Sequence, residues 1–203
     1  MEVIKIEKQH LELIAKLHKE NFSDEHTTFY LGEDLLKKYY KQFLNRQDIF
    51  FLGIEKNGRI VGIILGGDKD ILAFCRKQFL ENYKNLLMKD IIRSVLITPY
   101  FAYKLFYERI FLKFFYKEKI FDKINLENSY NILSIVVDKK ERGKGLGKLL
   151  VDEFEKVCKE NNKEYLTLSV RKSNKNAISF YKKVGFIPYK ETNLGLYLYK
   201  KVI

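Results

Sequence analysis

The stretch ILSIVVDKKERGKGLG, residues 132–147, decides how this chain is organised. Its first part, residues 132–137, is apolar and β-branched, as expected of a buried strand. A short charged loop follows, and the spacing of apolar residues over 145–161 then predicts a helix. Three glycines alternate where the loop meets the helix: Gly143, Gly145 and Gly147. The stretch is therefore predicted to be a strand, a glycine-rich turn and a helix.

The predicted turn has the properties of a phosphate-binding site. The first turn of a helix presents backbone N–H groups without intrahelical acceptors, at the positive end of the helix dipole. Glycines there let a ligand approach the backbone. Three cations flank the turn: Arg142, Lys144 and Lys148. We therefore expect this turn to bind a phosphorylated ligand.

Two common phosphate-binding motifs do not fit this turn. A Walker loop requires Ser or Thr after its Gly-Lys pair, but Leu149 follows Lys148, and its first glycine would fall on Arg142. A dinucleotide fingerprint requires a third glycine at the position of Lys148. The pattern Arg-x-x-Gly-x-Gly, in contrast, is matched at every specified position by residues 142–147.

A second motif lies downstream, where residues 174–186, NKNAISFYKKVGF, match the pattern N-x-x-A-x-x-F-Y-x-x-x-G-F. The two motifs, in this order, resemble those of the GNAT superfamily of acetyl-CoA-dependent N-acetyltransferases. The resemblance covers about residues 1–68 and 131–203. It implies the mixed α+β GNAT fold, a mostly antiparallel central sheet flanked by helices, in a single domain over 1–203.

The resemblance also implies the binding residues. In this family the strand before the glycine turn splays from its neighbour, and the pantetheine arm of CoA pairs with it. The pantetheine arm is expected to lie along Ile135, Val136 and Val137. Asn174 is expected to contact the same arm. The pyrophosphate is expected on the backbone of Arg142, Gly143, Lys144, Gly145, Leu146, Gly147 and Lys148. Acetyl-CoA is thus the implied co-substrate, and no metal site is expected.

The implied reaction is direct acetyl transfer to a primary amine. The neutral amine attacks the thioester carbonyl, and a backbone N–H near Val136 or Val137 stabilises the oxyanion. Tyr181 occupies the general-acid position, and an ordinary tyrosine is protonated at neutral pH. Spacing alone favours a packing role for Tyr181 on an amphipathic helix, whereas the motif around it favours the acid role, and Asn174 is also explained as an N-cap. Both interpretations stay open at the level of the sequence.

The general base and the acceptor are less well marked. Asp24, Glu25 and His26 lie in a segment that often borders the acceptor site in this family, and Asp138 follows the predicted cofactor strand. Each is also explained as a solvated charge. An amino sugar, an amino acid, a polyamine, and a protein N-terminus or lysine are all candidate acceptors, and a longer acyl-CoA is a candidate donor.

The remaining predicted elements follow from hydrophobic periodicity. Strands are expected over 2–6, 49–55, 59–65, 165–170, 186–190 and 196–202, and helices over 9–22, 32–46 and 174–183. Asn57-Gly58 predicts a hairpin turn, and Gly185 predicts a helix end. Cys158 falls on the apolar stripe of its helix, which indicates a buried thiol.

Residues 69–130 lie outside the family's common core, and we predict that they form a helical insertion between the third and fourth strands. Helices are expected over about 71–88, 89–98 and 100–120. Within 71–123, 11 Lys or Arg stand against five Asp or Glu, among many aromatics. Packing over the core, acceptor recognition, and contact of 100–120 with a membrane surface or a partner are the interpretations that stay open.

Composition and charge limit which other classes of protein are possible. The 203 residues carry a net charge of +12, which raises the question of nucleic acid, but no nucleic-acid-binding motif accompanies it. A binding module that uses this basic surface for nucleic acid or membrane is the alternative to an enzyme. Two cysteines and no signal peptide or apolar run of spanning length predict a cytoplasmic protein without a transmembrane segment. The resemblance also allows a homodimer.

Overall fold

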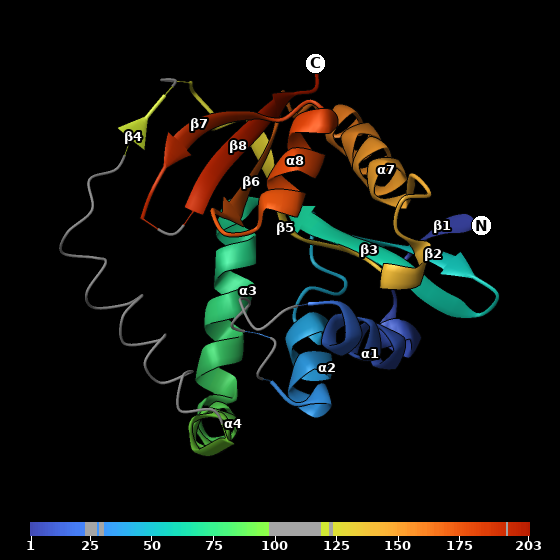
Figure 1. The fold of residues 1–203 in the computed structure, drawn as a ribbon, viewed down its shortest axis with the longest axis vertical. Coiled ribbons are helices and arrows are strands. Elements are labelled where there is room, and N and C mark those ends of the chain that lie inside the picture. Colours follow the sequence, from blue (N-terminus) through green and yellow to red (C-terminus); the bar gives the residue numbers. More distant parts are fainter. Residues whose placement is uncertain (23–27, 29–30, 98–118, 122–123, 194) are drawn as a thin grey trace.

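The computed structural model describes residues 1–22, 28, 31–97, 119–121, 124–193 and 195–203. These residues form an eight-stranded sheet with helices on both faces (Figure 1), in the strand order β1-β2-β3-β5-β6-β8-β7-β4. The strands are β1 (Glu2–Lys5), β2 (Ile49–Lys56), β3 (Arg59–Gly67), β4 (Lys119–Ile120), β5 (Ser129–Val137), β6 (Tyr165–Arg171), β7 (Ile187–Glu191) and β8 (Gly195–Lys201). The helices are α1 (Leu11–Asn21), α2 (Glu33–Lys41), α3 (Lys69–Asn82), α4 (Lys84–Ile97), α7 (Leu146–Glu160) and α8 (Lys175–Lys183), with short 3-10 turns η1 (Lys8–His10) and η4 (Lys139–Glu141).

Strand pairing is antiparallel except where β5 meets β6. β2 and β3 form the predicted hairpin, and its turn residues Asn57 and Gly58 have φ values of 51° and 69°. β3 pairs antiparallel with β5, which pairs parallel with β6. The remaining pairs, β6–β8, β8–β7 and β7–β4, are again antiparallel. The mixed, mostly antiparallel sheet that the sequence predicted is confirmed.

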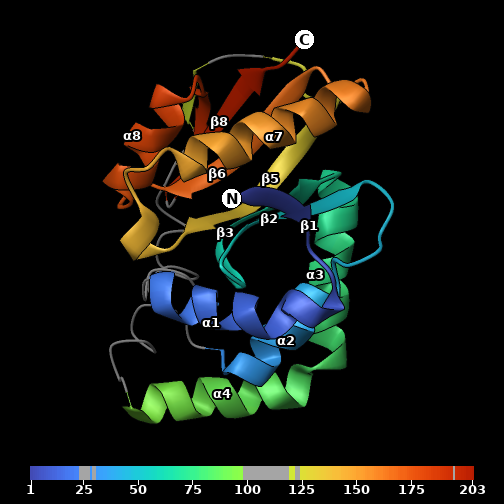
Figure 2. The same cartoon turned by 90° about the vertical axis from the view of Figure 1, so that its right-hand side faces the viewer.

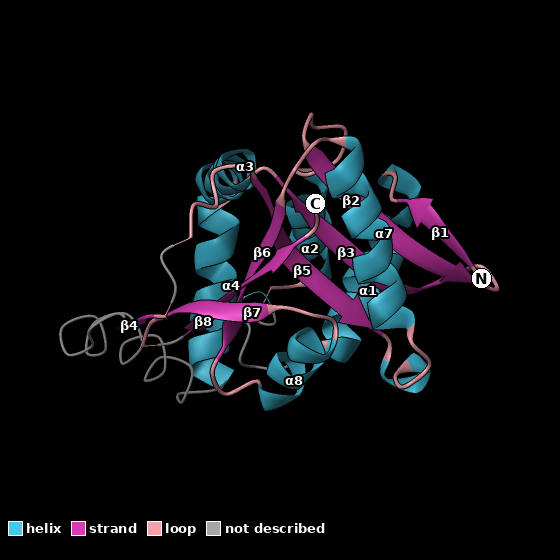
Figure 3. Cartoon of the chain, turned by 90° about the horizontal axis from the view of Figure 1, so that it is seen from above, coloured by secondary structure: helices cyan, strands magenta, loops and turns pink. Residues whose placement is uncertain are grey.

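Helices cover the two faces of the sheet separately (Figures 2 and 3). α7 and α8 pack on one face, where Leu150 and Phe154 are fully buried. α1, α2 and α3 pack on the opposite face, where Ile14 and Ile63 are fully buried. Cys158 of α7 is fully buried in the first core, as predicted, and burial raises the pKa of its thiol to about 12.

Within the insertion, two predicted helix boundaries are wrong. α3 ends at Asn82 and α4 begins at Lys84, whereas the predicted break lay between residues 88 and 89. The backbone turns at Tyr83, which has φ −119° and ψ 19°, and apolar periodicity runs through this turn without marking it. The helix predicted over 100–120 falls mainly outside the described residues, and its last two residues belong instead to β4.

Two further boundaries differ from prediction. α2 ends at Lys41, five residues before the predicted end, because the chain turns there and Asn45 takes a φ of 53°. β5 begins at Ser129, three residues earlier than predicted, because pairing with β6 starts there. In the part of the chain that is described, no helix has the length and apolar character needed to cross a membrane.

Candidate functional site

β5 and β6 separate in the middle of the sheet. Their pairing runs from Ser129 to Ile132, whereas the pairing of β5 with β3 continues to Val137. The register with β3 shifts where Leu65 opposes Ser134 and Gly66 opposes Ile132, which leaves Leu133 as an extra residue. This β-bulge stands at the point of separation. Beyond it, residues 133–137 have β3 on one side and, among the described strands, no partner on the other.

The direction of the backbone groups on this edge follows from one hydrogen bond. The Asp138 N–H donates to the Val61 carbonyl of β3 over 2.9 Å. Since successive residues of a strand direct their backbone groups to opposite sides, Ile135 and Val137 face the opened side and Val136 faces β3. The Val137 carbonyl accepts from Arg142 Nε over 3.1 Å. The Val137 N–H and the backbone of Ile135 are therefore the groups directed into the opening.

A cavity of about 860 Å³ lies where the strands separate, between β5, α7 and α8. Most of the residues predicted to bind cofactor line it: Ile135, Val136, Val137, Arg142, Gly143, Gly145, Leu146, Gly147, Lys148, Asn174 and Tyr181. The exception is Lys144, whose ammonium group pairs with Glu141 over 2.8 Å. The structure thus brings together two motifs that lie about 30 residues apart in the sequence.

The three glycines of the turn serve two purposes. Gly143 and Gly145 have φ values of 79° and 80°, in the left-handed region that favours glycine, with open space at the position of a Cβ. Gly147 has an ordinary backbone, but a Cβ there would lie 3.1 Å from the Phe180 ring of α8. The first two glycines permit the turn, and the third lets α7 pack closely against α8.

The N-terminus of α7 opens into the cavity without a cap of its own. Gly145 is the N-cap residue and offers no side chain. The first backbone hydrogen bond into the helix is donated by Leu149 to the Gly145 carbonyl, over 3.0 Å. The N–H groups of Leu146, Gly147 and Lys148 precede that bond, at the positive end of the helix dipole. This arrangement suits an anion.

Charged side chains around the cavity are mostly basic. Five cationic side chains and one carboxylate, Glu141, line it, the cations being Lys139, Arg142, Lys148, Lys175 and Lys183. Glu141 pairs with Lys56 and with Lys144, each over 2.8 Å, and these contacts hold the pKa of its carboxyl below the usual value. Lys148 pairs with Asp152 over 2.6 Å, one turn along α7.

α8 contributes two of the predicted residues. Asn174 caps the helix, because its Oδ1 accepts from the Ala177 N–H over 3.0 Å. Tyr181 is only 8% exposed and packs against the rings of Phe180 and Phe186, yet it lines the cavity. Burial raises the pKa of its hydroxyl, so the hydroxyl stays protonated at physiological pH. Tyr181 therefore packs among aromatic rings and also lines the cavity, while its role as general acid stays a prediction.

Sequence reasoning missed several residues of the cavity. Asn21 and Phe22 enter it from the end of α1, and Lys139, Lys175 and Lys183 add cations. Lys175 and Lys183 belong to the second motif and Lys139 to the charged loop before the first, whereas nothing in the sequence near Asn21 marks it. Asp138 caps the turn η4 by accepting from the Lys140 N–H. Asp24, Glu25 and His26 lie outside the described residues.

Comparisons with known proteins bear on this arrangement. A family model described as "Acetyltransferase (GNAT) family" matches residues 11–186. The "Uncharacterized N-acetyltransferase YobR" of Bacillus subtilis (strain 168) is 35% identical over 98 residues, which is 44% of this chain and 40% of YobR. The match therefore spans less than half of that relative.

Solved structures agree on the fold. One described as that of an acetyltransferase superposes with a TM-score of 0.63 at 21% identity, covering all of both chains. The PaiA N-acetyltransferase from Thermoplasma acidophilum, in complex with coenzyme A, superposes with a TM-score of 0.61 at 17% identity, covering 98% of both chains.

Proposed function

Because this chain belongs to the GNAT family of acetyltransferases, we propose that it transfers an acetyl group from acetyl-CoA to a primary amine of a small molecule. One observation carries the proposal. The uncapped N-terminus of α7 and the partnerless edge of β5, among the described strands, line the same cavity. The first suits a pyrophosphate and the second an extended amide-containing arm, and CoA carries both.

The phosphates are held in this proposal by the turn and its cations. The N–H groups of Leu146, Gly147 and Lys148 meet the pyrophosphate, and the lining lysines and Arg142 balance its charge. The arm extends along β5, where Ile135 and the Val137 N–H offer backbone hydrogen bonds. Asn174 retains its Nδ2 for the arm, since Oδ1 is used by the helix cap.

The chemistry proposed is attack of a neutral amine on the thioester carbonyl. Oxyanion character develops on that carbonyl oxygen, and a preorganised N–H directed at it stabilises the charge. Of the two residues that sequence considerations favoured for this role, Val137 directs its N–H into the opening and Val136 directs its own toward β3. We therefore assign the oxyanion contact to Val137.

Tyr181 is the proposed general acid. Its raised pKa keeps the hydroxyl protonated and available to donate to the leaving sulfur. Because a thiol is ordinarily more acidic than such a tyrosine, the proton that Tyr181 gives to the leaving thiolate must be replaced by the one that the attacking amine loses, so that the net products are the amide and the CoA thiol. No protein nucleophile is required, and both cysteines, Cys75 and Cys158, are buried away from the cavity lining.

The acceptor is proposed to be a small primary amine, an amino sugar being one candidate. The five lining cations disfavour a polycationic acceptor, because like charges repel in a partly enclosed site. Asp24, Glu25 and His26 remain predicted acceptor-side residues. The cytoplasmic location, the single domain with an insertion at 69–130, the absence of nucleic-acid binding and a homodimer also remain predictions.

The proposal is tested by a panel of amines assayed for release of CoA from acetyl-CoA. We expect saturable turnover with one acceptor class and calorimetric binding of acetyl-CoA in the absence of acceptor. Nucleic acid titrated at physiological salt is the parallel measurement. Binding to nucleic acid without binding to acetyl-CoA would favour the non-catalytic module instead.

A further inference from the structure

Asn21, the last residue of α1, joins the helix to the glycine-rich turn. This residue is 9% exposed and belongs to the cavity lining. Oδ1 accepts from the Lys139 N–H over 2.8 Å, across 118 residues of sequence. Nδ2 donates to the Leu17 carbonyl over 2.9 Å, which fixes the amide in that orientation. The short turn η4, which leads into the glycine-rich turn, is therefore connected to α1 by a hydrogen bond from the opposite face of the sheet.

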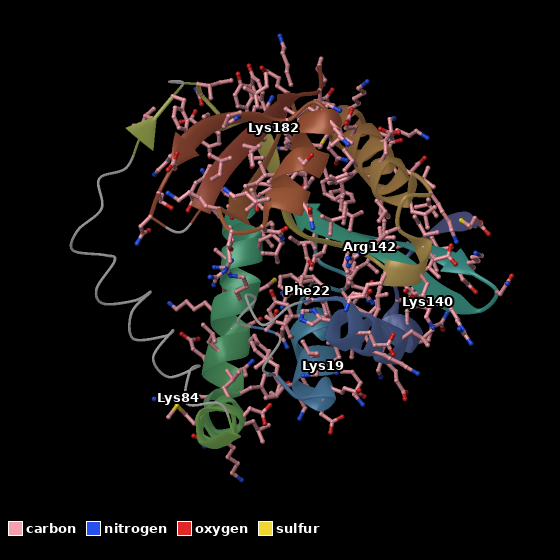
Figure 4. All side chains as sticks on the ribbon, in the orientation of Figure 1. Lys19, Phe22, Lys84, Lys140, Arg142 and Lys182 are labelled. Atoms are coloured by element: carbon pink, nitrogen blue, oxygen red, sulfur yellow. The ribbon has the colours of Figure 1, made fainter. Side chains whose placement is uncertain are left out.

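Arg142 provides the second connection to the same helix end. Its Nη2 lies 3.4 Å from the Asn21 carbonyl and its Nε donates to the Val137 carbonyl. A cation at the C-terminus of a helix interacts favourably with the helix dipole. Figure 4 shows Arg142 at the junction of the two halves of the molecule, near Phe22. The guanidinium thus links the ends of α1 and β5 and the start of the glycine-rich turn.

These contacts connect two parts of the cavity that the chain builds separately. The turn and α7 belong to the α7/α8 face of the sheet, whereas α1 belongs to the other face. A ligand that binds the turn more tightly when the turn is docked on α1 must, by linkage, stabilise the docked state.

We propose that Asn21 and Arg142 are positioning residues through which CoA binding at the turn stabilises the last turn of α1. The inference rests on the proposed function, because CoA is the ligand concerned. Beyond that function, CoA binding orders the α1 side of the cavity through these two side chains before an acceptor binds. Asn21 itself need not touch the reacting atoms.

The test is amide hydrogen exchange with and without CoA in the full chain. At a CoA concentration about ten times the Kd, amides that exchange only from the CoA-free form slow by up to about tenfold. In the wild type we expect this slowing both in the first turn of α7 and in the last turn of α1, residues 18–22. In Asn21→Leu, with CoA again set relative to that variant's own Kd, the contact of Arg142 with the backbone carbonyl of residue 21 remains, so the slowing in α1 is expected to fall below that in α7.

Asn161→Leu is the matched control. Asn161 follows α7, and its Nδ2 donates to the Val157 carbonyl over 2.8 Å, as Nδ2 of Asn21 does to Leu17. This variant loses the same local contact without touching the turn, and both regions should still slow. Arg142→Lys, at an exposed position, is the second variant should Asn21→Leu fail to fold, and it too should reduce the slowing in α1, because it loses the contact with the Asn21 carbonyl and keeps the hydrogen bond to Lys139.

The outcomes separate the two proposals. Slowing at α7 but not at α1 in the wild type would overturn the inference and leave the proposed function intact. The inference would also be overturned if α1 slowed as much in Asn21→Leu as in the wild type or, where Arg142→Lys replaces that variant, as much in Arg142→Lys. Absence of any CoA-dependent slowing at α7 in the wild type would contradict the proposed cofactor itself.

Discussion

Two helices begin in the same cavity, and their first turns differ. α7 begins at Gly145, which has a left-handed backbone and no side chain to cap the helix. α8 begins at Asn174, whose side chain accepts from Ala177 within its own first turn. In α7 the backbone N–H groups of the first turn are thus available to a ligand. In α8 one of the corresponding N–H groups is bonded by the Asn174 side chain.

This difference indicates a division of roles. The open start of α7 offers backbone N–H groups to an anion, so α7 is suited to binding. The closed start of α8 holds its helix in place, and α8 contributes a side chain, Tyr181, to the cavity. The comparison predicts that substitutions in α7 alter affinity for CoA, whereas those in α8 alter turnover or stability.

The largest expected effect is on turnover. Tyr181→Phe removes the proposed acid, and kcat is expected to fall about 100-fold or more, while the calorimetric Kd for acetyl-CoA changes by less than about twofold. Tyr165→Phe, on the far end of β6 where it pairs with Ser129, is the control and should retain activity. Unchanged turnover in Tyr181→Phe would leave Tyr181 as a packing residue alone.

The next effect is on affinity. Gly145→Val places a β-branched residue at a φ of 80° and adds bulk at the start of α7, so we expect the Kd for acetyl-CoA to rise about 30-fold or more. Gly58→Val introduces similar strain at a φ of 69° in the β2–β3 turn, far from the cavity. If both variants bind equally well, the open N-terminus of α7 is not the phosphate site.

A smaller effect is expected at the closed helix start. Asn174→Ala loses the cap of α8 and should lower the free energy of unfolding by about 1 kcal/mol, as followed by chemical denaturation. The Kd for CoA should rise only about threefold, through loss of the Nδ2 contact. Asp68→Ala, which removes the equivalent cap of α3, should cost similar stability without changing the Kd. A larger loss of affinity than in Gly145→Val would reverse the proposed roles of the two helices.

The smallest effect concerns the charge at the start of α7. Lys148 is paired with Asp152, and both side chains are well exposed, so Asp152→Asn should release the lysine for phosphate and tighten CoA binding by about twofold. The gain should disappear at high salt. Glu153→Gln, which removes the Lys156 pair on the same helix outside the cavity lining, is the control. Weaker CoA binding in Asp152→Asn would indicate that Lys148 does not contact the phosphates.

Much of the site was predictable because its elements are local. The strand, turn and helix over 132–161 follow from periodicity and glycine spacing, and the cap at Asn174 and the helix end at Gly185, where φ is 95°, follow from side-chain type. The reason for the glycines was only partly predictable. The sequence indicated close approach of a ligand, whereas a Cβ at Gly147 would lie 3.1 Å from the Phe180 ring of another helix, which is a tight contact.

The helix and strand boundaries that were predicted wrongly lie where local sequence preference and tertiary packing disagree. Leu87 is buried in the small core beneath α3 and α4, so apolar periodicity continues across Tyr83 although the helix does not. β5 extends upstream to Ser129 because β6 pairs with it there, and that pairing is set by residues more than 30 positions later.

By itself the sequence determined the glycine-rich turn, the capped helix α8 and the hairpin, because each depends on backbone preferences and spacing over a few residues, whereas the mostly antiparallel sheet was implied by the resemblance to the GNAT family. Tertiary structure alone decided at which residue β5 leaves β6, which backbone groups face the opening, and that Asn21 binds the loop before the glycine-rich turn. These features depend on contacts between residues as far as 118 positions apart, and no local preference of the chain records them.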